Sequence, residues 1–276
     1  MRKNDIFNEK NKNNGSLKYF IIAFALFIVA LAAVSAFLFM RSIDYDFGNM
    51  INAETDSTSQ SETEPESTTY SVNDLSGKSC VLFICEDNSG KLQYAFSVDT
   101  DFGSKNMLVS VVDGADTAEY NGISISYTDL YEKHRVAGVK EAFSSLNIVA
   151  EKYVVFDKNA FLTFFSEFDG ISVNVKEKVD YKSDSFNLEL DAGTQVLSAD
   201  YLYKYLTVSN SQTRASVICD IVSGVLRPEY TEKSEHLFNK FVNSTKTDIS
   251  VIDYSECINN LIVYSKAEDK FLPQIN

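Results

Sequence analysis

The sequence predicts an α/β fold in which helices cover a β-sheet, and two observations lead to this. Segments rich in β-branched and aromatic residues alternate with segments whose apolar residues recur at helical spacing. Residues 75–276, roughly 200 positions, are also long enough to bury a full-sized core as one domain. Strands interleaved with helices in this way are typical of an α/β sandwich.

The elements follow from these patterns in chain order. Strands are predicted over 79–85, 92–98, 107–112, 152–156 and 171–175. Helices are predicted over 129–146, 158–168, 199–206, 211–226, 234–241 and 253–264. Phe156 ends one strand, and Phe161 and Phe165 belong to the helix that follows. Ordinary core packing explains these rings first, but the same rings would line an apolar cavity if the fold contains one.

The N-terminal part of the chain predicts a membrane anchor. Residues 19–40 contain no charged side chain, and about 22 residues cross the hydrocarbon core as one helix. Basic residues dominate before this run and acidic residues after it, which predicts a cytoplasmic tail over 1–18 and an extracellular C-terminal domain. A signal peptide cleaved after Ala36 is the alternative, but the apolar run exceeds the usual signal core of about 7–15 residues and continues beyond that site.

Residues 41–74 are predicted to be a disordered linker. After its first residue the segment has no Lys or Arg, and it is rich in Ser, Thr and Glu. Such a segment cannot bury enough apolar surface to offset its chain entropy. Its carboxylates contribute much of the net charge of −14, which disfavours nucleic acid as a partner.

Cysteines and histidines form no metal or catalytic pattern in the sequence. Cys80 and Cys85 lie an odd number of positions apart on one predicted strand, so their side chains should point to opposite faces. All four cysteines are predicted to be ordinary buried thiols; the other two are Cys219 and Cys257. The two histidines, in charged segments, are predicted to be solvated: His134 and His236. The chain contains no G-x-S-x-G elbow, P-loop or dinucleotide glycine pattern.

Several segments, in order, resemble motifs of the LytR-CpsA-Psr family of membrane-anchored cell-envelope proteins. Residues 168–175 resemble its l-G-G-V-x-V-x-V strand, and residues 193–205 resemble G-x-x-x-L-x-G-x-x-A-L-x-Y. Residues 108–112 stand where the family has l-l-S-I-P-R-D-T, and residues 247–250 resemble T-D-l-S. The resemblance covers nearly all of the predicted domain.

This resemblance implies a three-layer sandwich, with a central mixed sheet covered by helices on both faces. It also implies an apolar cavity that holds a polyprenyl chain, for which Phe156, Phe161 and Phe165 would be lining residues. Active members are similar to phosphotransferases that move a glycopolymer from undecaprenyl pyrophosphate to peptidoglycan with Mg²⁺. The retained family positions are Asp87, a weak metal candidate, and the ligand-binding candidates Tyr205 and Arg214.

The chain lacks most of the family arginines. The arginine of S-I-P-R-D-T falls on Asp113, or on Ala115 in a shifted register, and Thr207 and Ser209 replace the two that follow the conserved tyrosine. A pyrophosphate leaving group needs guanidinium groups to stabilise its developing charge, and losing one such donor costs about 10²–10³ in rate. We therefore predict that the family reaction is lost and that no catalytic residue can be assigned.

Three functions are compatible with the sequence. The favoured one is a membrane-bound protein that binds a polyprenyl-phosphate lipid or cell-wall polymer without efficient catalysis and acts on other family members. The second is an active phosphotransferase, with Mg²⁺, whose arginines come from elsewhere, such as Arg135 or Arg227. The third is a structural or interaction module with a collapsed cavity. For Arg135 a surface ion pair with Glu132 is predicted, and for Glu86 and Asp87 an exposed acidic turn. The composition suits a low-GC Gram-positive bacterium.

Overall fold

The computed structural model describes residues 70–276 and contains a six-stranded sheet. The strands of this sheet are β1 (Lys78–Glu86), β2 (Leu92–Asp101), β3 (Asn106–Asp113), β6 (Lys152–Phe156), β11 (Lys246–Thr247) and β12 (Gln274–Ile275). Their order is β11-β6-β1-β2-β3-β12. The sheet is mixed, because β1 runs antiparallel to β2 and parallel to β6, and β12 runs parallel to β3.

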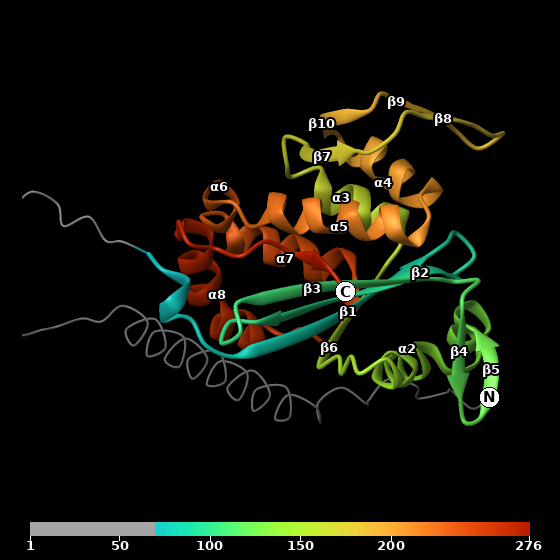
Figure 1. Cartoon of the computed structure of the whole chain (residues 1–276), viewed down its shortest axis with the longest axis horizontal. Helices are drawn as coiled ribbons and strands as arrows, with labels where there is room; N and C mark the ends of the chain where they lie inside the picture. Colours follow the sequence, from blue (N-terminus) through green and yellow to red (C-terminus); the bar gives the residue numbers. More distant parts are fainter. Residues whose placement is uncertain (1–69) are drawn as a thin grey trace, which may run out of the picture. The chain divides into compact units, whose positions relative to one another are not determined.

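Helices cover both faces of this sheet (Figure 1). They are α2 (Tyr127–Ser145), α3 (Lys158–Phe165), α4 (Ala199–Val208), α5 (Ser211–Val225), α6 (Pro228–Thr231), α7 (Ser234–Ser244) and α8 (Val251–Lys266). Helix α2 packs on one face, and α3, α5 and α7 lie over the other (Figure 1). The predicted three-layer α/β sandwich is confirmed.

Three two-stranded ribbons complete the fold. They pair β4 (Thr117–Tyr120) with β5 (Ile123–Ser126), β7 (Ile171–Val175) with β10 (Gly193–Leu197), and β8 (Val179–Lys182) with β9 (Asn187–Leu190). Figure 1 shows the last two ribbons together above α4, apart from the main sheet. Strand β7 was predicted, but its place outside the main sheet was not.

Alternation along β1 assigns each side chain to one of two cores. Leu82 and Ile84 pack in the core under α2, whereas Cys85 packs in the core under α3 and α5. Cys80 belongs to the α2 side, so the two neighbouring cysteines point to opposite faces as predicted. All four cysteines are free thiols; Cys219 is only half-buried and Cys257 is exposed, so the prediction of burial holds for Cys80 and Cys85 alone.

The fold begins upstream of the predicted start at residue 75. Val72, in a short 3-10 helix (η1, Val72–Asp74), is fully buried, and its N–H donates to Asp269 Oδ1 at 3.0 Å. The predicted tail, anchor and most of the linker, residues 1–69, lie outside the described residues. Between residues 70 and 276 no helix is both long and apolar enough to cross a bilayer.

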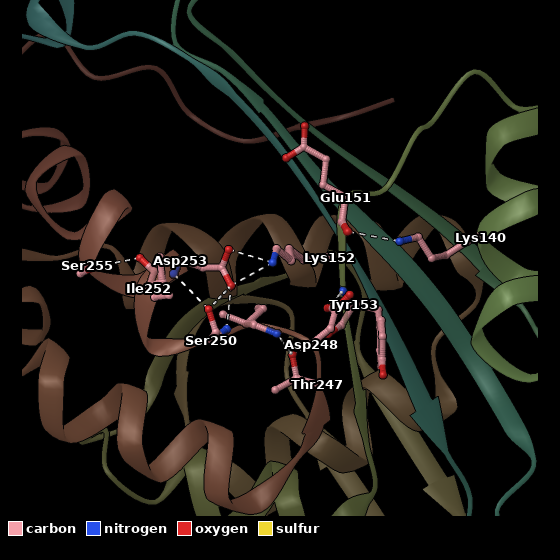
Figure 2. A network of polar contacts seen from close by, with 11 residues as sticks. Lys140, Glu151, Lys152, Tyr153, Thr247, Asp248, Ser250, Ile252, Asp253 and Ser255 are labelled. Carbon is pink, nitrogen blue, oxygen red and sulfur yellow. Dashed lines mark hydrogen bonds and ion pairs between the residues drawn. The ribbon is translucent and has the colours of Figure 1, made fainter.

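Residues 247–250, the T-D-l-S resemblance, join the end of the sheet to helix α8 (Figure 2). The Thr247 hydroxyl donates to the Tyr153 carbonyl at 2.6 Å, and Asp248 Oδ1 accepts the Tyr153 N–H at 2.7 Å. Ser250 then caps α8 in a capping box with Asp253. The contacts of this motif are therefore those of a structural clasp.

The clasp predicts an acid-sensitive contribution to stability. Lys152 Nζ lies 2.8 Å from Asp253 Oδ1, and its hydrogen bond, with those of Ser250, holds the pKa of Asp253 well below its ordinary value. Because the folded-state pKa is lowered, the contribution is complete at neutral pH and is lost as pH falls below about 4. Thermal unfolding followed by circular dichroism should show that Asp253→Asn lowers Tm at pH 7 and flattens the decline of Tm between pH 5 and pH 3.

The matched control is Glu256→Gln, which removes an exposed carboxylate from the same helix. It should leave Tm and its pH dependence nearly unchanged. An Asp253→Asn profile parallel to that of the unmodified chain would contradict the assignment.

Candidate functional site

An apolar cavity of about 370 Å³ lies between the sheet and the helices on the α3 side. Phe156, Phe161 and Phe165, the three rings singled out from the sequence, all line it, and Phe161 and Phe165 lie 4.3 Å apart between ring centroids. Phe83 and Phe96 contribute stacked rings from the sheet, 4.7 Å apart. An open cavity of this kind does not support the collapsed-cavity alternative.

Helix α7 forms a wall of this cavity that the sequence did not reveal. Its Leu237, Phe238 and Phe241 line the cavity, yet no residue of the helix is buried. Phe241 contacts Phe164 of α3 with 5.4 Å between ring centroids, and Tyr254 of α8 stacks on Phe238 at 4.5 Å. Apolar side chains left partly open beside a cavity are a feature of ligand-binding grooves.

Arg214, on α5, is buried beside this cavity. Its guanidinium lies 4.5 Å from the ring centroid of Tyr94, and Tyr94 lines the cavity. Its Nε donates to the Leu206 carbonyl at 2.8 Å, its Nη2 donates to the Ser209 carbonyl, and its Nη1 forms an ion pair with Asp113. With only 4% of its side chain exposed, Arg214 directs three of its five N–H groups to acceptors of the protein itself.

The carboxylate of Asp87 shapes the turn between β1 and β2. Its Oδ1 accepts the Ser89 N–H at 2.8 Å, the Ser89 hydroxyl at 2.7 Å and the Lys91 N–H at 2.9 Å. Partial burial alone would raise the pKa of Asp87, but these hydrogen bonds hold it below the ordinary value.

At the edge of the sheet where β1 and β3 end, the carboxylates of Asp87 and Asp113 already accept hydrogen bonds from the protein. Magnesium takes carboxylate oxygens in an octahedral shell, but Asp87 Oδ1 already accepts three hydrogen bonds. Asp113 offers its two oxygens to Arg214 and to the Ser211 hydroxyl. In the part of the chain that the structure describes, no three His, Cys, Asp or Glu side chains are grouped to hold a metal ion.

Solved structures share this architecture at low sequence identity. A protein from Eubacterium siraeum described as a transcription regulator is 19% identical with TM-score 0.62, over 80% of this chain and 88% of its own. Bacillus subtilis TagV is 17% identical with TM-score 0.60, over 73% of this chain and 85% of its own. TagT bound to LI-WTA is 14% identical with TM-score 0.54, over 79% and 87%. The chain has a LytR-CpsA-Psr-like fold. No protein-family model and no curated protein matches the sequence.

Within this LytR-CpsA-Psr-like fold, Asp113 takes the place that the resemblance gives to an arginine. Its carboxylate pairs with Arg214, the surviving arginine, and also accepts the Ser211 hydroxyl at 2.6 Å. A carboxylate here neutralises the charge of this guanidinium, which would otherwise attract a pyrophosphate. A bound diphosphate would also meet the negative charge of Asp113.

Tyr205, the other ligand-binding candidate, is buried in the helical layer and is not among the cavity-lining residues. Its neighbour Tyr203 lies closer to the aromatic wall, 5.5 Å from Phe161 between ring centroids, with Lys158 Nζ 5.8 Å from its ring. Burial and the nearby Cys85 raise the pKa of Tyr203 to about 12. The prediction for Tyr205 came from the family resemblance alone, and neither tyrosine is among the residues that line the cavity.

A second, polar pocket of about 360 Å³ lies on the α2 side of the sheet. Glu86, predicted to lie in an exposed turn, is instead buried there, accepting the Tyr131 hydroxyl at 2.7 Å. Lys246 Nζ lies 3.2 Å from the other Glu86 oxygen. The predicted ion pair between Arg135 and Glu132 is not formed; Arg135 lies over the Tyr131 ring, 5.4 Å from its centroid.

The two histidines are on the surface, as predicted. His134 stacks near Tyr120 with 4.8 Å between ring centroids. His236 Nε2 lies 2.9 Å from Glu167 Oε2, and Lys240 contacts the other oxygen of the same carboxylate at 2.9 Å. Neither histidine lies in the apolar cavity or in the polar pocket.

Proposed function

We propose that this chain is a membrane-anchored, extracytoplasmic LytR-CpsA-Psr-like protein that binds a polyprenyl-linked ligand without efficient catalysis. One observation carries the proposal: an open apolar cavity adjoins a buried arginine that is already paired with a carboxylate of the same chain. The cavity supports binding of a lipid chain. The internal ion pair argues against turnover of a pyrophosphate.

The binding energy would come from the aromatic walls. Each buried CH₂ group contributes about 0.8 kcal/mol, so a few isoprene units in the cavity suffice for retention. The partly open wall of α7 provides the side from which a long chain can extend beyond a cavity of about 370 Å³. A polyprenyl tail fits this shape better than a polar ligand does, because the lining is almost wholly hydrocarbon.

The ion pair between Arg214 and Asp113 disfavours efficient catalysis. Cleavage of a pyrophosphate builds negative charge that several guanidinium groups and a divalent ion must stabilise. Here Arg214 donates to Asp113 and to two backbone carbonyls, so binding a phosphate through it would first break these contacts. The two other arginines considered, Arg135 and Arg227, do not replace the missing family arginines. Arg135 lies in the polar pocket on the opposite face, and Arg227 pairs with Glu229 at 3.7 Å.

The position of the protein follows from the sequence pattern. Residues 19–40 would anchor it once in the cell membrane, with the N-terminus cytoplasmic and residues 70–276 outside. The partners that fit are polyprenyl-phosphate lipids or cell-wall polymers, and active family members that share the same ligand. The acidic chain does not favour nucleic acid.

The experiment that tests this function measures binding and turnover together. The full-length chain in detergent is incubated with a polyprenyl pyrophosphate and Mg²⁺, and bound lipid and released phosphate are both measured. We expect retention of the intact lipid, with phosphate release at least about 10²-fold slower than for an active family member assayed in parallel. Release at a comparable rate would show that the chain is an enzyme, and failure to retain the lipid would refute the binding function.

A further inference from the structure

The polar pocket on the α2 side is separate from the apolar cavity. It is lined by the β1–β2 turn, helix α2, strand β6 and Lys246 of β11, and it shares no lining residue with the cavity. Glu86 and Cys85 are adjacent on β1 and point to opposite faces, Glu86 into this pocket and Cys85 into the core beside Arg214. What occupies the pocket is therefore independent of the proposed lipid-binding function.

Glu86 organises the floor of this pocket. Glu86 is buried, with 8% of its surface exposed, but its carboxylate has two partners. It accepts a hydrogen bond from the Tyr131 hydroxyl at 2.7 Å, and Lys246 Nζ lies 3.2 Å from its other oxygen. The Lys246 side chain is 78% exposed, and its ammonium has N–H donors left over after this contact. Burial, then the hydrogen bond to Glu86, raises the pKa of Tyr131, so its hydroxyl stays protonated at neutral pH.

Arg135 gives the pocket a second positive charge at a cost in backbone strain. Its φ of 53° and ψ of −148° interrupt helix α2, and this conformation is unfavourable for any residue other than glycine. Among residues 70–276 its guanidinium has no ion-pair partner, and it rests over the Tyr131 ring at 5.4 Å. Strained residues of this kind concentrate at binding sites, where a side chain must be held in one place.

We propose that this pocket binds an oxyanion, a phosphate or carboxylate group, between Arg135 and Lys246. Two cationic side chains and one carboxylate, Glu86, leave a surplus positive charge facing the pocket. The guanidinium offers a planar pair of donors that matches either group, and the ammonium supplies a second point of attachment. Glu86 acts as a positioning residue, because it fixes Tyr131 and Lys246 without contacting the anion.

Thermal unfolding of the full-length chain in detergent tests this site. Inorganic phosphate and acetate are compared with chloride at equal ionic strength, so that screening of surface charge is the same in each sample. At twentyfold excess over Kd, at least one of the two oxyanions should raise Tm by about 3–6 °C. The anion that gives the larger rise identifies the group that the site prefers.

Variants at the two cations make the test specific. Arg135→Gly should raise Tm without added anion by about 2–4 °C, because glycine relieves the strained φ, and it should abolish the anion-dependent rise. Lys246→Gln, which keeps a hydrogen-bond donor to Glu86, should lower the affinity for the anion about tenfold. Lys133→Ala, an exposed cation on the same helix outside the pocket, is the matched control and should respond like the unmodified chain.

Three results would overturn the proposal. The first is the absence of any rise in Tm with either oxyanion. The second is an anion-dependent rise that persists in Arg135→Gly and Lys246→Gln, and the third is a rise that disappears equally in Lys133→Ala. If Arg135 were merely a strained surface residue, Arg135→Gly would be more stable and the anion response would not change.

Discussion

Replacing Arg214 with alanine is expected to lower Tm of the chain by about 5–12 °C, through a loss of about 2–4 kcal/mol. The side chain is only 4% exposed and donates to the carbonyls of Leu206 and Ser209 as well as to Asp113. Removing it leaves these acceptors without their donor and withdraws a cation from the face of Tyr94, 4.5 Å from the ring centroid. Circular dichroism or differential scanning calorimetry of the full-length chain measures the shift.

Two further variants separate a structural arginine from a ligand-binding one. Arg227→Ala removes a half-exposed guanidinium at the start of α6 and should change stability by less than about 0.5 kcal/mol. Asp113→Asn keeps an oxygen for Ser211 but removes the charge that neutralises Arg214. It should therefore destabilise the fold and yet increase affinity for a diphosphate headgroup. An Arg214→Ala chain as stable as the unmodified one would contradict the assignment of Arg214 to an internal ion pair.

Filling the apolar cavity is expected to remove its lipid. Ala160, on α3, lines the cavity and is 6% exposed, so phenylalanine at this position places a ring where the chain of a lipid would lie. We expect Ala160→Phe to reduce the polyprenyl lipid retained per protein at least tenfold. Overpacking should cost about 1–3 kcal/mol, which a domain of this size tolerates.

The matched control for this variant is Ala137→Phe, the same change at an exposed position of α2. It should retain the lipid of the unmodified chain. Lipid extraction followed by mass spectrometry, normalised to protein, compares the three proteins. Equal lipid in Ala160→Phe and Ala137→Phe would place the ligand somewhere other than this cavity.

Strong local patterns explain the parts of the fold that the sequence predicted well. Strands β6 and β7 were predicted with their observed bounds, Lys152–Phe156 and Ile171–Val175, because β-branched and aromatic residues fill both. Strands β11 and β12 were missed, since each has two residues and exists only through pairing with β6 and β3. Helix α3 ends at Phe165, before the predicted limit, although Phe168 still packs on Tyr230 through the turn that follows.

The sequence predicted the features of the candidate site that depend on residue type. It did not predict the features that depend on how distant elements pack together. Helical spacing predicted the helix that carries Phe161 and Phe165, whereas only the family resemblance implied the cavity that both residues line. The burial of Glu86 depends on its contact with Tyr131 of α2, a residue 45 positions away in the chain, and no local pattern predicts that contact or the positive φ of Arg135. The pairing of Asp113 with Arg214 joins two positions far apart in the chain, and the sequence could show only that an arginine was replaced.

Native mass spectrometry of the full-length chain, purified in detergent from its own host, tests most directly whether the protein holds an uncleaved polyprenyl lipid. It reports the occupancy, the chain length and the headgroup of any bound lipid in one measurement. We expect a polyprenyl-linked species that remains intact and bound when Mg²⁺ is added. A chain that carries no polyprenyl lipid, or one whose bound lipid is cleaved on addition of Mg²⁺, would contradict this expectation.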